Sequence, residues 1–164
     1  MLDHSTFRFL DPGPLVDGDL TLVPARRNPP DPAKGWVASY DFEMWVNDAG
    51  HPVGKVNFRA QDHPMLELYR GHIGYGVDPG HRGRHLAERS VRLLFPLMRR
   101  HGFASIWITC NPDNRPSRRT CERLGAELVE IIPLPSAEDM HSRGEREKCR
   151  YRLDLPQGAT FSET

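Results

Sequence analysis

The segment Tyr75–Ala87 places a strand, a turn, a basic loop and the start of a helix in immediate succession. An apolar stretch ends at Val77, a Pro-Gly turn follows, and an amphipathic helix begins after Arg82-Gly83-Arg84. Backbone N–H groups and the positive end of a helix dipole then converge on one point, which favours a bound anion. Arginine side chains add charge-assisted donors for phosphate oxygens. The segment therefore predicts a phosphate-binding loop between a strand and a helix.

The charge of the chain is balanced overall but concentrated locally. Twenty-two basic and 22 acidic residues cancel, so there is no global attraction for nucleic acid or for an anionic membrane. Ten arginines nevertheless lie between Arg82 and Arg123, against three acidic residues. A local basic surface on a neutral protein suits a small polyanionic ligand better than a polymer. Nucleic-acid binding is the alternative, and it would require a steep salt dependence of polymer affinity.

Length and cysteine content favour one cytoplasmic domain. The 164 residues predict a single domain over 1–155, followed by a flexible tail over 156–164. Residues 1–5 are likewise expected to be frayed. No signal peptide or membrane span is expected. The three cysteines are widely spaced and form no CxxC pair, which argues against a disulfide framework or a zinc site: Cys110, Cys121 and Cys149. The pair His81 and His85 has helical spacing but no third ligand, so we expect no metal.

The hydrophobic pattern predicts strands, helix, strand, helix and two closing strands. Helices are expected over His85–His101 and between a capping Asn114 and a terminating Gly125. Residues 10–35 are rich in proline and glycine and leave little room for a long helix. The expected strands, of which the second and third form a hairpin, are Leu20–Val23, Ser39–Asn47, Val53–Arg59, Glu67–Val77, Ser105–Cys110, Glu127–Ile132 and Lys148–Leu155.

A second signature follows the basic loop: Asn111-Pro-Asp-Asn114-Arg-Pro-Ser117, then Cys121-Glu-Arg-Leu-Gly125. With the loop, it resembles the GNAT superfamily of acyl-CoA-dependent N-acetyltransferases from about Gly71 to Ile132. The tetrad His72-Ile73-Gly74-Tyr75 is similar to the Glu-Ile-Gly-Tyr of the ribosomal-protein-acetylating branch. The resemblance implies an α/β (α+β) fold, with a mixed, mostly antiparallel central sheet that is splayed at the cofactor site and flanked by helices.

The resemblance also implies a site for acetyl-CoA. The family's pyrophosphate loop has the pattern Arg/Gln-x-x-Gly-x-Gly/Ala, and His85 stands here in place of the middle glycine, which normally tolerates unusual φ angles. Main-chain groups at the end of the strand would meet the pantetheine, loop N–H groups would hold the pyrophosphate, and the second helix would reach the adenosine phosphate. The implied cofactor-binding residues are Tyr75, Gly76, Val77, Arg82, Gly83, Arg84, His85, Leu86, Ala87, Asn111, Asn114 and Arg118.

Acetyl transfer from a thioester to an amine needs a neutral amine, a polarised carbonyl and a proton donor for the leaving thiolate. His72 replaces the family's glutamate and is the candidate base, since an imidazole titrates near neutral pH; a partly exposed strand histidine without a catalytic role is the alternative. Glu43 and Glu67 are further acids of unknown orientation. The family's donor tyrosine is replaced by Cys121, so Ser117 is the better candidate donor, although a buried cysteine and a helix-capping serine are the simpler interpretations. Backbone amides near the strand end would polarise the carbonyl.

These implications lead to a functional hypothesis. We expect a cytoplasmic N-acetyltransferase that moves an acetyl group from acetyl-CoA to a primary amine by direct transfer in a ternary complex. The acceptor would be a small-molecule or peptide amine, with no nucleic acid or membrane as partner and a homodimer as one option. A non-catalytic acyl-CoA-binding module is the alternative, because the base and acid positions have both changed. The proline-rich residues 10–38 further predict an open acceptor site.

Overall fold

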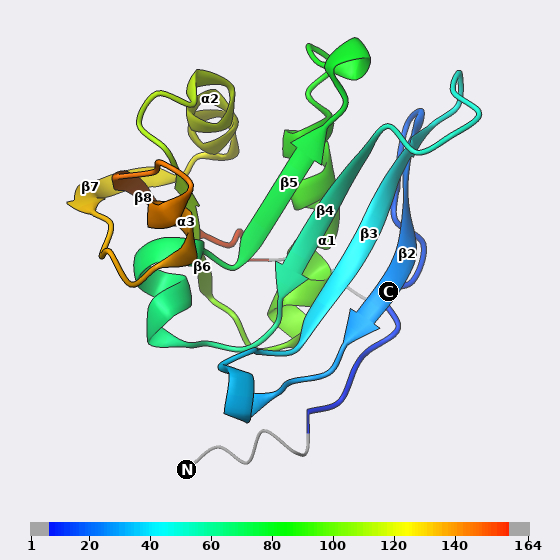
Figure 1. Cartoon of the computed structure of the whole chain (residues 1–164). Helices are drawn as coiled ribbons and strands as arrows, with labels where there is room; N and C mark the ends of the chain where they lie inside the picture. Colours follow the sequence, from blue (N-terminus) through cyan, green and yellow to red (C-terminus); the bar gives the residue numbers. More distant parts are fainter. Residues whose placement is uncertain (1–6, 158–164) are drawn as a thin grey trace.

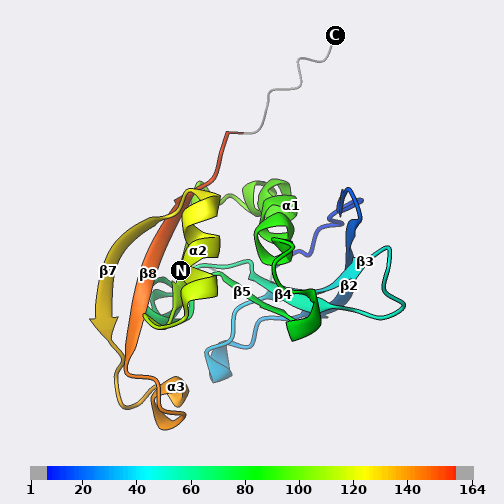
Figure 2. The ribbon, with the colours of Figure 1, turned by 90° about the horizontal axis from the view of Figure 1, so that it is seen from above.

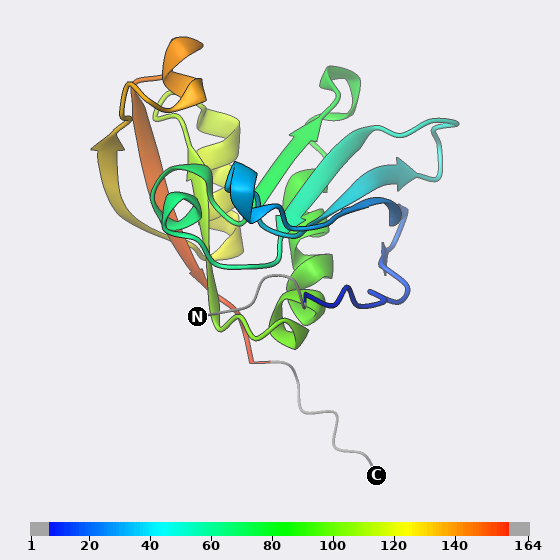
Figure 3. The ribbon, with the colours of Figure 1, turned by 60° about the horizontal axis from the view of Figure 1, so that its bottom comes forward.

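Two antiparallel sheets lie side by side and diverge toward one end (Figures 1 and 3). The computed structural model describes residues 7–157, so the predicted frayed start and most of the predicted tail lie outside the described residues. The larger sheet has the strand order β1 (Val16–Asp17), β2 (Leu20–Asn28), β3 (Ser39–Val46), β4 (Gly54–Arg59) and β5 (Ile73–Val77). The smaller sheet has the order β6 (Ser105–Cys110), β8 (Glu147–Asp154) and β7 (Glu127–Pro133).

Helices flank both sheets. Helix α1 (Leu86–Arg100) covers one face of the larger sheet, and α2 (Arg115–Leu124) lies beside the smaller sheet (Figure 2). The two predicted helices are confirmed, including the cap: Asn114 accepts a hydrogen bond from the Ser117 N–H, and Gly125 ends α2 with a positive φ. Shorter elements are the 3-10 turns Pro32–Lys34 and Pro79–His81, a π-helical turn at Leu66–Arg70, and the short helix α3 (Asp139–Ser142).

The core forms between α1 and the larger sheet because both have one apolar face. Alternate residues of β3 are buried, as expected for a strand with one face on the core. The predicted hairpin is confirmed, with Phe42 opposite Val56 and Tyr40 opposite Phe58. Burying a large aliphatic or aromatic side chain contributes about 1.5–3 kcal/mol. The fully buried members include Phe42, Met44, Phe58, Val91, Leu94 and Met98.

The two sheets touch at the point from which they diverge. The N–H of His72 donates to the carbonyl oxygen of Trp107 at 2.7 Å, and the N–H of Trp107 donates to Nδ1 of His72 at 2.9 Å. Beyond this point β5 pairs with β4 and β6 pairs with β8, and no ladder connects β5 to β6. The predicted splay is therefore large enough to divide the central sheet in two.

The strand predicted over Glu67–Val77 is too long and is corrected by the structure. Leu66–Arg70 forms a π-helical turn, and the strand begins only at Ile73. The break lies at Gly71, whose φ of +69° favours glycine and whose added Cβ would approach the Trp107 carbonyl oxygen to 3.0 Å. The alternating pattern of this segment therefore extends in the N-terminal direction beyond Ile73, where the strand begins.

The N-terminal part contains strand where only loop and a short strand were expected. Strand β2 extends to Asn28 because the register shifts between Pro24 and Arg26, and such a bulge accommodates a proline in a strand. Over residues 7–38 the 3-10 turn at Pro32–Lys34 is the only helical element. No helix among the described residues is both long and apolar enough to cross a membrane.

Candidate functional site

A cleft of about 660 Å³ lies between the two arms of the molecule, at the end of β5 and the N-termini of α1 and α2. Its walls include the loop over Arg82–Ala87, which was predicted to hold phosphate. Nearly all of the predicted cofactor-binding residues of β5 and the loop line it, with residues of α2 on the opposite side. These are Tyr75, Gly76, Val77, Arg82, Gly83, His85, Leu86 and Ala87, facing Asn114, Arg115, Ser117, Arg119 and Arg123.

His85 takes up the backbone conformation that a glycine would adopt at this position. Its φ is +57°, and it is the only non-glycine residue with positive φ among residues 7–157. A left-handed conformation costs an L-residue about 1–2 kcal/mol. His85 precedes α1 without making a side-chain capping bond, so the first N–H groups of the helix stay directed at the cleft. The His85 substitution therefore keeps the geometry of an anion-binding helix N-terminus.

Two of the arginines predicted to bind the cofactor direct their side chains elsewhere. Arg84 donates to Asp19 at 2.6 Å and to Asp48 at 3.3 Å, on the outer side of the loop. Arg118 donates to the hydroxyl of Tyr151 at 3.0 Å and to a backbone carbonyl. Neither side chain lines the cleft, whereas Arg82, Arg119 and Arg123 do. Side-chain direction on the loop and on α2 thus depends on tertiary partners.

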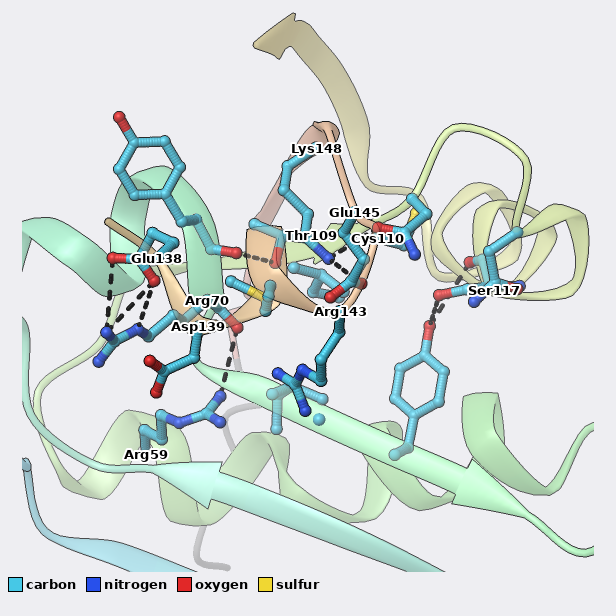
Figure 4. A pocket seen from close by; sticks show the side chains of 18 of the residues that line it. Arg59, Arg70, Thr109, Cys110, Ser117, Glu138, Asp139, Arg143, Glu145 and Lys148 are labelled. Carbon is cyan, nitrogen blue, oxygen red and sulfur yellow. Dashed lines mark hydrogen bonds and ion pairs between the residues drawn. The ribbon is translucent and has the colours of Figure 1, made fainter. Parts of the chain in front are cut away.

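A second cleft of about 480 Å³ continues from the first toward the start of β5 and the β7–β8 connection. Three residues line both clefts: Tyr75, Asn114 and Ser117. The far part of the second cleft is formed by charged side chains from β4, the π-helical turn, α3 and β8 (Figure 4). Trp36 is 58% exposed and lines this cleft. The molecule therefore has a continuous groove with two chemically different halves.

Tyr75 and Ser117 are in contact at the junction of the two halves. The Tyr75 hydroxyl lies 2.9 Å from Ser117 Oγ and 3.4 Å from the Ser117 carbonyl oxygen (Figure 4). Burial raises the pKa of Tyr75 well above its ordinary value, so its hydroxyl stays protonated. Either hydroxyl can be the donor of this bond, and when Tyr75 donates to Oγ, the Ser117 proton is free to point into the groove. The sequence placed both residues near the cofactor but did not indicate this bond.

His72 occupies the junction of the sheets and does not line the groove. Its side chain is 1% exposed, Nε2 lies 2.7 Å from Asp62 Oδ1, and Nδ1 accepts from Trp107. Burial lowers the pKa of His72, with an opposing effect of Asp62. Both ring nitrogens are engaged, so the geometry favours a structural role over the predicted role as a base. The alternative interpretation was a partly exposed strand histidine without a catalytic role. Its exposure was wrong, because the side chain is buried.

The cysteines lie close to the groove but differ in access to it. Cys121 is fully buried and lines neither half, so nothing in its position supports the predicted role as a proton donor. Cys110 is 5% exposed and lines the second cleft. Hydrogen bonding with Cys121 lowers the pKa of Cys110 to about 7, assisted by Ser117 and Arg118. No group of three or more His, Cys, Asp or Glu side chains arranged to hold a metal occurs among the described residues.

The other predicted residues and several unpredicted ones complete the groove. Asn111 lines the second cleft and accepts a hydrogen bond from Lys148 Nζ at 2.8 Å. Lys148 also pairs with Glu145 at 2.9 Å, and this lowers the pKa of Glu145 against the effect of its burial. No sequence signal indicated the groove residues contributed by β4 and the β7–β8 connection. Of the further acids, Glu67 is exposed on the π-helical turn, and Glu43 lies on the outer face of the larger sheet.

Comparison with known proteins identifies the family. The acetyltransferase (GNAT) family model matches residues 8–126. The ribosomal-protein-S5-alanine acetyltransferase from Vibrio fischeri is a similar solved structure, with a TM-score of 0.58 and 16% identity over 73% of this chain and 63% of that one. The microcin C7 self-immunity acetyltransferase, solved with acetyl-CoA and AMP, has a TM-score of 0.56 and 21% identity over 71% of this chain and 61% of that one.

A third similar structure is the Salmonella typhimurium acetyltransferase that modifies the N-terminal serine of a 50S ribosomal subunit protein, with a TM-score of 0.54 and 18% identity over 76% of this chain and 67% of that one. The chain thus spans slightly less than two thirds of the first two structures, and at these identities the likeness shows the fold. A search of curated protein sequences gave no match. Because the family model matches most of the chain and the splayed fold agrees with it, this protein belongs to the acetyltransferase (GNAT) family.

Proposed function

We propose that the protein transfers an acetyl group from acetyl-CoA to a primary amine, directly and within a ternary complex. The observation that carries the proposal is the continuous groove, whose two halves meet at the Tyr75–Ser117 hydrogen bond. One half has the open helix N-terminus and basic side chains suited to a pyrophosphate. The other half is accessible to a second substrate, because residues 7–38 contain no helical element longer than the 3-10 turn Pro32–Lys34.

The cofactor half fits acetyl-CoA by its shape and its donors. The N–H groups after His85 and the guanidinium groups of Arg82 and Arg119 would hold the phosphates. The edge of β5 that faces β6 is unpaired, and an added Cβ at Gly74 or Gly76 would meet no atom within 4 Å, so the backbone there is accessible to an extended pantetheine arm. When bound, acetyl-CoA supplies the thioester. A similar structure solved with acetyl-CoA, that of the microcin C7 self-immunity acetyltransferase, supports this assignment.

Ser117 is proposed as the proton donor to the leaving thiolate. With the Tyr75 hydroxyl as donor to Oγ, the Ser117 proton is directed into the groove, where it can pass to the sulfur and be replaced from solvent. The amine nitrogen forms a bond to the thioester carbon, the bond from carbon to sulfur breaks, and the sulfur receives the proton. Alignment of the two substrates supplies much of the rate enhancement.

Glu145 is the carboxylate proposed to receive the proton of the amine. It lines the acceptor half, and its bonds with Lys148 and Asn111 lower its pKa, so it is ionised at neutral pH. In Figure 4 it lies on the side of the cleft toward Ser117, whereas Glu138 and Asp139 lie toward Arg59 and Arg70. A carboxylate of low basicity is sufficient, because a fraction of an amine is already neutral near pH 7.

The test is release of CoA thiol from acetyl-CoA with a panel of primary amines, combined with equilibrium binding of acetyl-CoA. We expect amine-dependent thiol release that decreases strongly in Ser117→Ala while acetyl-CoA still binds. Binding of acetyl-CoA without thiol release from any amine would contradict the proposal and would favour the non-catalytic binding module.

A further inference from the structure

The acceptor half of the groove carries an excess of positive charge. Five basic and three acidic side chains line it: Lys34, Arg59, Arg70, Arg143 and Lys148, with Glu138, Asp139 and Glu145. Two ion pairs account for part of this charge. Arg70 donates two nitrogens to Glu138 at 3.3–3.4 Å, and Lys148 pairs with Glu145 at 2.9 Å. Three basic residues and one acid of the cleft lie outside these pairs.

Arg59 is a half-buried arginine whose hydrogen-bond partners are neutral. Its Nη1 donates to the carbonyl oxygens of Gly71 at 3.0 Å and Arg70 at 3.3 Å. Among the described residues, no carboxylate lies within ion-pair distance of it. Burial and the neighbouring Arg70 lower its pKa, and the more distant charge of Asp41 opposes this only in part. A group that pairs with the remaining guanidinium nitrogens would therefore bind favourably.

Arg143 supplies a second unpaired cation from the β7–β8 connection. Its side chain lines the cleft and is exposed, and no carboxylate of residues 7–157 lies within ion-pair distance of it. Figure 4 shows its guanidinium projecting into the cleft between Glu145 and Arg59, without a drawn partner. Arg59 and Arg143 thus come from opposite walls, and a ligand placed between them would contact both.

We propose that Arg59 and Arg143 form an anion subsite for the acceptor, so that the favoured acceptors are primary amines that carry a carboxylate or phosphate group. The inference rests on the proposed acetyltransferase function and deepens it by naming the acceptor class. With the amine at the Tyr75–Ser117 junction, the anionic group lies deeper in the acceptor half. Forked guanidinium donors suit carboxylate and phosphate oxygens equally.

The subsite is separate from the positions proposed for the phosphates of acetyl-CoA. Those phosphates would lie at Arg82 and Arg119, which line the cofactor half and are absent from the acceptor half. Lys34 does not duplicate the pair, because its ammonium lies 4.6 Å from the ring centroid of the exposed Trp36 and 4.0 Å from Asp31. Asp139 is the acid that remains in this part of the cleft, and among the described residues no ion pair joins it to Arg59 or Arg143.

The experiment compares peptides that share a free N-terminal serine and differ only in charge. The acidic peptide is Ser-Glu-Glu-Ala amide, the neutral one is Ser-Gln-Gln-Ala amide, and a third carries phosphoserine in place of the first glutamate. For the wild-type protein we expect kcat/KM to be about ten- to a hundredfold higher for the anionic peptides, as charge-assisted hydrogen bonds imply. The relative rates with glutamate and phosphoserine distinguish the two sources of negative charge.

The variants are Arg143→Gln and Arg59→Gln, with Arg146→Gln as the matched control. Arg146 belongs to the same connection, but its guanidinium donates to the backbone carbonyls of His141 and Glu145 and does not line the cleft. We expect Arg143→Gln to raise KM about tenfold for the acidic peptide and much less for the neutral peptide. If Arg59→Gln fails to fold because it loses its bonds to the π-helical turn, the exposed Arg143 still provides the test.

Calorimetric binding of the same peptides to the protein with CoA separates this proposal from the proposed function. Tighter binding of acidic peptides that depends on Arg143, without any turnover, would support the anion subsite and contradict the transferase. Turnover at equal kcat/KM for acidic and neutral peptides would overturn the anion subsite and leave the transferase intact. An equal loss of kcat/KM for the acidic and the neutral peptide in Arg143→Gln would also overturn the anion subsite.

Discussion

The Tyr75 hydroxyl lies 2.9 Å from Ser117 Oγ and connects β5 to α2 across the opening between the two sheets. No backbone ladder joins these elements, so this side-chain bond is one of the contacts that define the junction between the cofactor and acceptor halves. Its two members lie far apart in the sequence and line both halves of the groove. A change at either residue should therefore affect catalysis more than fold.

The first prediction concerns the proton donor. Ser117→Ala should lower kcat by about a hundredfold, the lower end of what general acid catalysis contributes. Tyr75→Phe should lower kcat less, because Ser117 keeps its own proton and loses only its orientation. Acetyl-CoA affinity should change little in both. Steady-state kinetics and equilibrium binding test this, with Ser105→Ala at the start of β6 as a control outside the groove; unchanged kcat in Ser117→Ala would exclude the serine as donor.

The second prediction separates two adjacent arginines of α2. Arg119 lines the cofactor cleft, whereas Arg118 is held by the Tyr151 hydroxyl and the Pro112 carbonyl. Arg119→Gln should weaken acetyl-CoA binding about three- to fivefold, as expected for one exposed charge contact, and should reduce the salt dependence of binding. Arg118→Gln should leave affinity unchanged and lower the urea midpoint of unfolding. Equal effects of the two substitutions on affinity would contradict the assigned side-chain directions.

The third prediction uses the left-handed conformation of His85. His85→Gly removes the steric cost of this conformation but adds freedom to the unfolded chain, so stability should change by less than about 1 kcal/mol. His85→Val should destabilise by about 1–2 kcal/mol relative to the glycine variant, because a β-branched residue tolerates positive φ poorly. His85→Asn should have a stability between those of the glycine and valine variants. Urea unfolding of the three variants tests the order, and a valine variant as stable as the glycine variant would show that the loop can adopt another conformation.

The fourth prediction is a loss of stability at acidic pH. Burial lowers the pKa values of His72 and His101, and for His101 the nearby Arg100 adds to the effect. Unfolded imidazoles titrate near pH 6.5, so above that pH both states are neutral and stability is fully present. Below it, the unfolded chain binds protons that the folded chain does not, and stability decreases as pH falls toward the folded pKa values.

The urea midpoint measured from about pH 7.5 to about pH 5 tests this linkage. His72→Gln should reduce the slope by about one proton, and it should cost stability at neutral pH because the Trp107 N–H loses its acceptor. A stability that is independent of pH over this range would show that His72 takes up its proton without breaking the junction of the sheets.

Local chemistry made most of the fold predictable. The alternation in Ser39–Val46, the apolar stripe of Leu86–Arg100 and the Asn114 and Gly125 caps each specify an element through interactions within a few residues, and all are found. The longer β2 was one exception, and the strand before the basic loop was another. Its start at Ile73 depends on the close approach of Gly71 to Trp107, a contact between distant residues that no local pattern encodes.

The sequence by itself determined the end of the strand, the loop and the helix of the cofactor half, because an apolar alternation, a Pro-Gly turn and an amphipathic pattern specify them through interactions within a few residues. The directions of individual side chains were decided only by tertiary structure. His72 is buried at the junction of the sheets, Arg84 and Arg118 turn to distant partners, and Arg59 and Arg143 line the same cleft. Each outcome depends on which distant charges and hydrogen-bond partners the fold brings within a few ångströms, and this information lies in the packing of the two sheets.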